Sequence, residues 1–351
     1  MSYPNMPANG QFSGRPAPQP TDGPRVGQPS PSYPLAVRDS GLGTAWLLLM
    51  RTLPYALARF AVLLAATAIG MAWLVVAFGG AWWIGDRVST MFGFAWLVPW
   101  LLAGGWMWGT VIRYSLHLIA CGHVAVLTQL ITRGSVGSGD ESQFAFGRRV
   151  VISRFGEVTA LFGVNVMIAG VLAAVHGTLD WLGEMLPIPG VQGIASLLNL
   201  ILKAATRYLD KVVLSYSLAQ GETDAWQSAR DGIIYYCQNA RTILKTSIWI
   251  VVMEAILSAL LFLAVCGLGA VLAASLPPDW REVGSSAILI FSVLLAVVAR
   301  AAFVKPLFLI CLMIRFHTVI EQQPLSQDWV DKLDHLFQRV RRGAAPASAT
   351  I

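Results

Sequence analysis

The chain has 351 residues, of which 56 % are apolar and only 13 % are charged, and its net charge is +6. A soluble globular domain carries about 25 % charged residues, so this composition excludes an ordinary cytosolic enzyme and a disordered scaffold. The mean hydropathy of +0.61 indicates an all-α integral membrane protein with several spanning helices.

The first 40 residues differ in composition from the rest of the chain. They contain nine of the eighteen prolines, with Gly, Ser, Gln and Asn between them. Such a segment buries too little apolar surface to offset the entropy lost on ordering. We therefore expect three regions: a disordered proline-rich tail (1–40), a polytopic membrane domain (41–320), and an amphipathic helix with a flexible tail (321–351).

Six apolar stretches follow the tail, and each is read as a helix that crosses the bilayer. About 20 residues of α-helix cross ~30 Å of hydrocarbon. The sequence therefore predicts a six-helix transmembrane bundle, with spans at residues 58–84, 92–111, 158–179, 191–205, 247–276 and 287–314.

The distribution of basic residues predicts how the chain is oriented in the membrane. Of the 25 Lys and Arg residues, 23 lie on one side of the predicted spans, and only Arg87 and Arg281 lie on the other. Because basic loops stay on the cytoplasmic side, both termini and both long loops are expected in the cytoplasm. The compact outer loops, and the lack of any Asn-X-Ser/Thr glycosylation site, favour a bacterial inner membrane.

Four cytoplasmic segments share one pattern, in which a polar turn leads into an aromatic residue and an amphipathic helix. They are residues 39–55, 140–154, 222–245 and 326–342. A mixed basic and apolar face beside a span is typical of a helix that lies in the membrane interface. A degenerate repeat of span, amphipathic helix and span is one hypothesis for this pattern.

Three charged residues fall inside predicted spans, where each charge costs roughly 2.5–3.5 kcal/mol. Glu254 and Lys305 are expected at similar depth on neighbouring antiparallel helices. Arg300 is expected deeper and on nearly the opposite bearing if its helix is regular. These groups could form a functional relay or gate, or a structural ion pair with Lys305 reaching toward the cytoplasmic face, which we favour.

Other polar and aromatic residues in the spans are candidates for binding. Asn165 and Asn199 could line a polar interior, or join helices by hydrogen bonds. Trp106 and Trp108 are candidates for an aromatic cage around a quaternary ammonium group. The tryptophans nearer the boundary favour an aromatic belt at the head-group level.

No pattern of a catalytic, metal or cofactor site is present. The four cysteines are scattered, and the spacing of His117 and His123 does not place them on one helix face. We find no nucleotide loop, no Ser-His-Asp order and no HExxH motif. The sequence therefore predicts no enzyme activity, metal or cofactor, and the absence of a basic run with interleaved aromatics argues against nucleic-acid binding.

Residues 205–320 resemble the choline-transporter-like solute carriers. The similarity lies in Tyr208-Leu209-Asp210-Lys211, Gly221, Ser228-Ala229-Arg230-Asp231, Asn239 and Val304-Lys305-Pro306-Leu307-Phe308-Leu309. The resemblance implies transport of choline, ethanolamine or a related small cation by alternating access. In that family an acidic residue precedes a Leu-Phe-Leu-Cys run, and Lys305 stands in its place in this chain. The family also has ten spans rather than six.

Two functions are compatible with these features. The first is a transporter-like protein that moves a small organic cation, such as choline, through a polar interior near Glu254, Lys305 and Asn199. The second is a non-catalytic membrane scaffold, which organises the bilayer or recruits a protein partner through its cytoplasmic amphipathic helices. In both, the lipid bilayer is the main partner.

Overall fold

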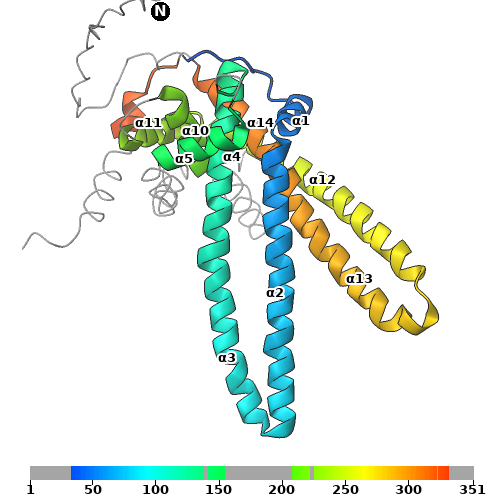
Figure 1. Cartoon of the computed structure of the whole chain (residues 1–351). Helices are drawn as coiled ribbons and strands as arrows, with labels where there is room; N and C mark the ends of the chain where they lie inside the picture. The colour runs from blue at the N-terminus through cyan, green and yellow to red at the C-terminus, as the bar shows by residue number, and fades with distance from the viewer. Residues whose placement is uncertain (1–32, 138–140, 155–207, 222–224, 322, 332–351) are drawn as a thin grey trace, which may run out of the picture.

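The computed structural model describes residues 33–137, 141–154, 208–221, 225–321 and 323–331. Two long helical hairpins extend from a group of helices at one end and diverge from each other (Figure 1). Four helices in the described part are long and apolar enough to cross a membrane: Leu53–Arg87, Thr90–Arg133, Ala240–Ala274 and Pro278–Ile320. The chain is therefore an all-helical protein of the membrane class.

The first hairpin is formed by α2 (Leu53–Arg87) and α3 (Thr90–Met107). The Ser89 side chain accepts a hydrogen bond from the Phe92 N–H and caps the start of α3. Gly93 allows close approach, because a Cβ atom there would lie 2.6 Å from the carbonyl oxygen of Ala81 on α2. After α3, a π-helical turn, η1 (Trp108–Ile112), leads into α4 (Arg113–Arg133).

The second hairpin is formed by α12 (Ala240–Ala274) and α13 (Pro278–Ala299). Here Gly269 permits the contact, because a Cβ atom at this position would overlap the side chain of Ser292 on α13. A second π-helical turn, η3 (Arg300–Val304), joins α13 to α14 (Lys305–Ile320).

The two hairpins share one construction. The helices α2 and α12 each have 35 residues. Thr52 separates α2 from the short helix α1 (Leu42–Arg51), and Asn239 separates α12 from α11 (Ala225–Gln238). The two breaks have nearly the same backbone angles, φ −106° and ψ 20° against φ −102° and ψ 18°. Arg154, which follows α5 (Gln143–Ser153), adopts similar angles of φ −114° and ψ 28°.

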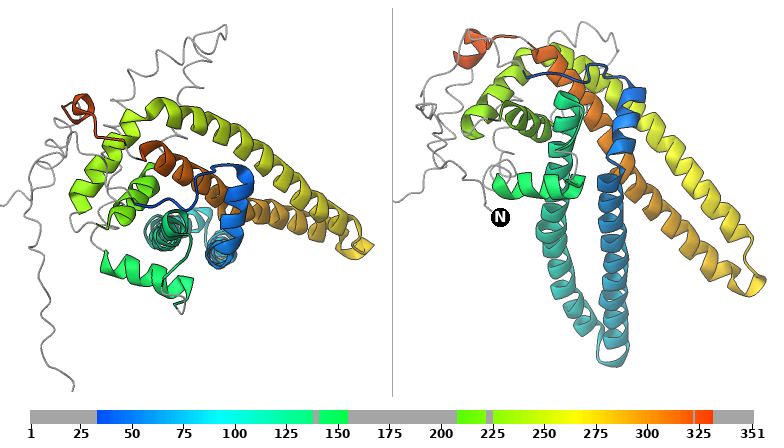
Figure 2. Two further views of the ribbon diagram at one scale, coloured as in Figure 1. Left: turned by 90° about the horizontal axis from the view of Figure 1, so that it is seen from above. Right: turned by 45° about the horizontal axis from the view of Figure 1, so that its top comes forward.

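The short helices pack with the inner ends of the long ones, and we call this group the head. It consists of α1, α4, α5, α10 (Leu209–Gln220), α11 and α14. Figure 2 shows α10 and α11 beside α14 at this end of the molecule. The largest fully buried side chains of the head are hydrophobic, and they come from α1, α4, α10, α11 and α14: Leu49, Leu127, Leu209, Tyr235, Phe308 and Phe316. The hydrophobic core of the described chain is therefore in the head.

The predicted spans are confirmed in four of six cases. Stretches 58–84, 92–111, 247–276 and 287–314 coincide with the two hairpins, whereas 158–179 and 191–205 lie outside the described residues. The first return helix runs from η1 through α4 to Arg133, well past the predicted end at residue 111, whereas the second ends at Ile320, close to the predicted end at residue 314. Burial in the head stabilises these extensions, which hydropathy alone does not mark as part of the same helix.

Residues 33–40 correct the predicted boundary of the disordered tail. Leu35 is buried, and the N–H groups of Ala36 and Val37 both donate to the carbonyl oxygen of Ile131 at the end of α4. Arg38 pairs with Glu321 beyond α14, with 2.6 Å between Nη2 and Oε1. This segment packs on the head because its N–H groups bind a free carbonyl at the end of α4 and because Leu35 adds buried apolar surface. It does so although its composition is like that of the tail.

The pair Arg38–Glu321 predicts a pH dependence of stability. Hydrogen bonds from the Arg38 guanidinium hold the pKa of Glu321 below its ordinary value of 4.5. A carboxylate whose pKa is lowered by folding stabilises the protein fully at pH values above its ordinary pKa. This stabilisation is lost as the pH falls through the lowered pKa. We expect E321Q to melt slightly below wild type at neutral pH, with the difference vanishing in acid. The control E282Q, at the outer turn, should show no such pattern in the same melting scans.

A chain of buried polar side chains crosses the head. The Tyr33 hydroxyl lies 2.7 Å from Nδ1 of His317, and Nε2 of His317 lies 2.7 Å from Oγ of Ser215. The Ser215 hydroxyl then lies 2.8 Å from the Thr128 hydroxyl. The chain joins the N-terminal segment, α14, α10 and α4, which are far apart in sequence, so it fixes their relative positions.

Removing the middle of this chain is expected to destabilise the head. S215A deprives His317 and Thr128 of one partner each, and leaving buried polar groups unsatisfied costs about 1–3 kcal/mol. The control S115A removes a hydroxyl that donates only to the Val111 carbonyl of its own helix. Chemical unfolding in detergent should show the loss for S215A alone, and equal stabilities of the two variants would contradict the assignment.

Candidate functional site

Among the sheltered charges of the described residues, two groups are candidate sites. One is an ion pair between the helices of the second hairpin, and the other is a polar pocket on the head.

The ion pair joins α12 to the π-helical turn η3. The carboxylate of Glu254 is 3 % exposed, and its Oε1 lies 3.0 Å from Nη2 of Arg300, whose side chain is 45 % exposed. Among the described residues, the pair lies within helices long and apolar enough to span a bilayer. A carboxylate in such surroundings requires a cation, because burial strongly disfavours an uncompensated charge.

The irregular helix explains why Arg300 makes this contact. In a regular helix, Arg300 points in nearly the opposite direction from Lys305. Because Glu254 and Lys305 were expected at similar depth in the membrane, Lys305 was the expected neighbour of Glu254. The structure differs from this expectation in the bearing of Arg300, because residues 300–304 form a π-helical turn. A π-turn adds a residue to the helical turn and changes the bearing of every side chain before it. Lys305 lies directly after the turn and is partly buried.

The other candidates from the spans do not assemble into a site within the described residues. Asn165 and Asn199 lie outside the described residues. Trp106 and Trp108 are 67 % and 49 % exposed on the surface of the first hairpin. The described aromatic contacts in this region are those of Trp100 with Trp73 and Trp96. The aromatic cage is therefore not formed by the part of the chain that the structure describes.

Within the described ranges, no three His, Cys, Asp or Glu side chains are grouped as the ligands of a metal ion would be. His117 and His123 do not converge, since His123 bonds to the Thr52 hydroxyl at 2.9 Å and stacks on Tyr55. The described thiols are single, and three of the four are buried.

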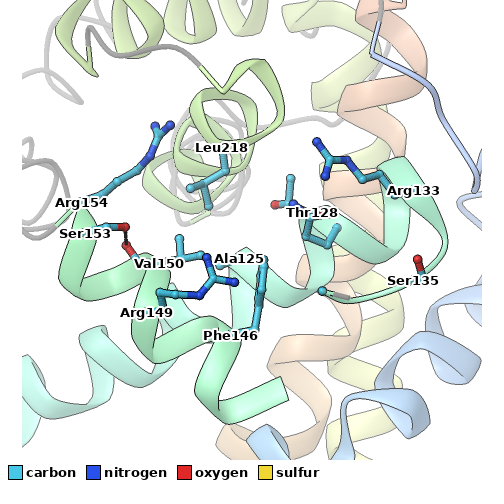
Figure 3. A pocket seen from close by; sticks show the side chains of 12 residues that line it. Ala125, Thr128, Arg133, Ser135, Phe146, Arg149, Val150, Ser153, Arg154 and Leu218 are labelled. Carbon is cyan, nitrogen blue, oxygen red and sulfur yellow. Dashed lines mark hydrogen bonds between the residues drawn. The ribbon is translucent and has the colours of Figure 1, made fainter. Parts of the chain in front are cut away.

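The polar pocket lies on the head between α4, α5 and α10 and has a volume of about 350 Å³. Figure 3 shows Arg149 and Arg154 on α5, Arg133 at the end of α4, and Leu218 on α10 between them. Phe146, Val150 and Ala125 form an apolar part of the lining, and Gln129 and Ser135 add polar groups. We call this the α4–α5–α10 pocket.

Local sequence explains how α4 and α5 place these arginines. Gly134, with φ +75°, ends α4 in the left-handed conformation that glycine adopts readily. The side chain of Ser142 accepts a hydrogen bond from the Ala145 N–H and starts α5. Gly147 on α5 lies against Gly122 on α4, where a Cβ atom would be 2.9 Å from the Gly122 carbonyl oxygen. This contact brings the Arg149 turn of α5 close to α4.

The arginines of the pocket have different electrostatic partners. Arg149 makes a two-pronged ion pair with Glu141, at 2.6 and 3.0 Å, and thereby lowers the pKa of that carboxyl. Nη1 of Arg154 donates to the Ser217 hydroxyl at 3.3 Å. Arg133 makes no ion pair or side-chain hydrogen bond with any residue of the described part. The pocket therefore carries a local excess of positive charge.

Sequence reasoning did not find this pocket. Arg133, Arg149 and Arg154 entered only the count of basic residues that predicts orientation, because no spacing along the chain marks them as a set. Arg149 and Arg154 lie five residues apart, which is not a same-face spacing. They converge with Arg133 only through the packing of α5 on α4.

Comparisons with known proteins give no further guide to the site. No family model, no curated protein and no solved structure matches the chain.

Proposed function

We propose that this chain is a non-catalytic membrane scaffold, which anchors a helical head at the cytoplasmic surface of the inner membrane. The observation that carries the proposal is the arrangement of two long apolar hairpins that diverge from one packed head (Figure 1). Their large side chains lie mainly on the outside, including Val75, Leu102, Leu263 and Val271. Lipid is the partner that suits such surfaces.

The short helices of the head support an interfacial position. On α1, Leu48 and Leu49 are buried, whereas Trp46 and Leu47 are exposed. On α5, Ile152 is exposed while its helix neighbours contact α4. An exposed apolar residue beside a basic helix end is typical of a helix that lies on the membrane surface. In the proposed scaffold these helices order the lipid around the two hairpins and present the head to protein partners.

Apolar grooves between helices also favour a scaffold over a channel. A groove between α12 and α13 is lined by side chains such as Leu268, Leu272 and Phe291, and another among α1, α12 and α14 by Trp46, Leu257 and Phe308. In the described part of the chain the polar pocket lies on the head rather than between the hairpins. A small cation crossing the membrane requires polar groups along its path.

Reconstitution tests the scaffold directly. At rising protein-to-lipid ratios, we expect vesicles imaged by electron microscopy to change in size or shape. W46Q, in α1 of the head, should weaken this effect. W280Q provides the matched control, since it removes an exposed tryptophan at the far turn of the second hairpin. Unchanged vesicles at all ratios, or an equal loss in both variants, would count against the proposal.

Partner recruitment and orientation need separate tests. A partner that co-purifies in detergent should be lost when residues 1–32 or 332–351 are deleted, because these deletions keep the packed residues 33–40 and Val330. A reporter fused after Arg281 should read as periplasmic, and one fused after the C-terminus as cytoplasmic. A cytoplasmic reading after Arg281 would contradict the topology.

The second candidate is transport of a small organic cation such as choline. One observation favours it: the sheltered carboxylate of Glu254 contacts Arg300 at a π-turn, and such turns are frequent at functional sites. In proteoliposomes, E254Q should then abolish choline uptake, whereas E282Q at the outer turn should leave it intact. Full uptake by a folded E254Q protein would remove Glu254 from the mechanism.

A further inference from the structure

We propose that the α4–α5–α10 pocket binds a phosphate group, a function that does not depend on the scaffold proposal. Arg133 and Arg149 approach the pocket from two helices, and Arg154 lies at its third side (Figure 3). A guanidinium group presents a rigid fork of N–H donors that matches phosphate oxygens, and such charge-assisted bonds are about twice as strong as neutral ones.

The donors needed for phosphate are available in the lining of the pocket. The guanidinium of Arg133 has no protein partner in the described ranges. Ser135 and Gln129 also line the pocket, and they can add a hydroxyl and an amide donor. These groups belong to α4 and the turn after it, so they face the α5 arginines across the opening.

Within the described residues, Glu141 is a carboxylate bound to one of these arginines, and it competes with an external anion. Glu141 holds both prongs of Arg149, as a bound anion would. The pair is exposed, so exchange for an external phosphate is inexpensive in free energy. Neutralising Glu141 should therefore strengthen binding by releasing Arg149, an effect that a merely structural role of Arg149 does not predict.

The apolar part of the lining indicates that the phosphate carries an organic group. Phe146, Val150 and Leu218 are apolar residues that line the pocket, and its volume of about 350 Å³ leaves room beyond one phosphate. Two sources share this chemistry. One is a soluble phosphomonoester, and the other is the head group of an anionic lipid beside α5.

Binding to the purified full-length protein in neutral detergent distinguishes the sources. Glycerol phosphate is the soluble probe, and short-chain phosphatidic acid is the lipid probe, with the affinity of each measured by thermal shift and calorimetry. If both probes bind, a soluble phosphomonoester is sufficient to occupy the pocket. If only phosphatidic acid binds, the ligand is the head group of a lipid.

Variants decide whether binding occurs in this pocket. R133Q and R149Q should each weaken binding about tenfold or more, and E141Q should strengthen it. R148Q is the matched control, because Arg148 is exposed on the same helix and does not line the pocket. Melting without ligand confirms that each variant is folded. Failure of both probes to bind, or an equal loss in R148Q, would overturn the proposal.

Discussion

R300M is expected to destabilise the protein by about 3 kcal/mol or more, because it takes the guanidinium from a sheltered carboxylate. Removing one partner of a buried pair typically costs 3–5 kcal/mol, whereas replacing both partners costs far less. Glu254 is 3 % exposed, so water does not replace the lost contact. The half-exposed Arg300 places the expected loss at the lower end of that range.

A double-mutant cycle measures this coupling. E254Q/R300M removes both charges and should be more stable than R300M alone, as recorded by unfolding in detergent micelles. R281M serves as the control, since Arg281 at the outer turn is exposed and should change stability little. If R300M unfolds like wild type, or if the effects of the two substitutions simply add, the ion pair does not hold α12 against η3.

G147A is expected to destabilise the head by about 1–3 kcal/mol through overpacking. A Cβ atom at Gly147 overlaps the Tyr55 hydroxyl and lies 2.9 Å from the Gly122 carbonyl oxygen. Tyr55 cannot move aside easily, because its ring stacks on His123 and contacts Phe144, with ring centroids 5.3 and 4.4 Å away. Either α5 moves away from α4, or Tyr55 leaves its place.

Two comparisons separate overpacking from a general effect of alanine. G43A introduces the same methyl group into α1, where no atom lies within 4 Å of the new Cβ, and the helix propensity of alanine should make it neutral or stabilising. Y55F removes the overlapping hydroxyl, so G147A/Y55F should recover part of the loss. Because the α4–α5–α10 pocket depends on this contact, G147A should also weaken phosphate binding. Wild-type stability of G147A would show that the helices are not closely packed there.

The hairpins show how far hydropathy predicts this fold. A span of about 20 apolar residues has to satisfy its backbone internally, so it is helical wherever it meets lipid. This constraint is local, and it gave the position of four spans without knowledge of any neighbour. Helices were also expected in the segments that contain α1, α5 and α11, and the structure has helices there. Their role differs from that of helices that lie only in the membrane interface, because each of them also packs in the head.

Bearings around a helix were harder to predict than positions along it. Counting residues placed Glu254 level with Lys305 and Arg300 deeper, whereas the contact of Arg300 with Glu254 depends on the π-turn at 300–304. No residue type in this turn predicts that it is π-helical. Pro306 follows η3, but η1 (Trp108–Ile112) forms with no proline inside it, so proline is not a general signal for such a turn. The choline-carrier resemblance and the roles of Asn165 and Asn199 remain predictions.

The sequence by itself determined the membrane class, the four described spans and the surplus of basic charge at one end, because each follows from local composition and helix length. Tertiary structure alone decided that residues 33–40 are packed, that Arg300 reaches Glu254, and that Arg133, Arg149 and Arg154 surround one pocket. These features join residues far apart along the chain through close packing, and packing depends on shape in three dimensions, which hydropathy does not encode.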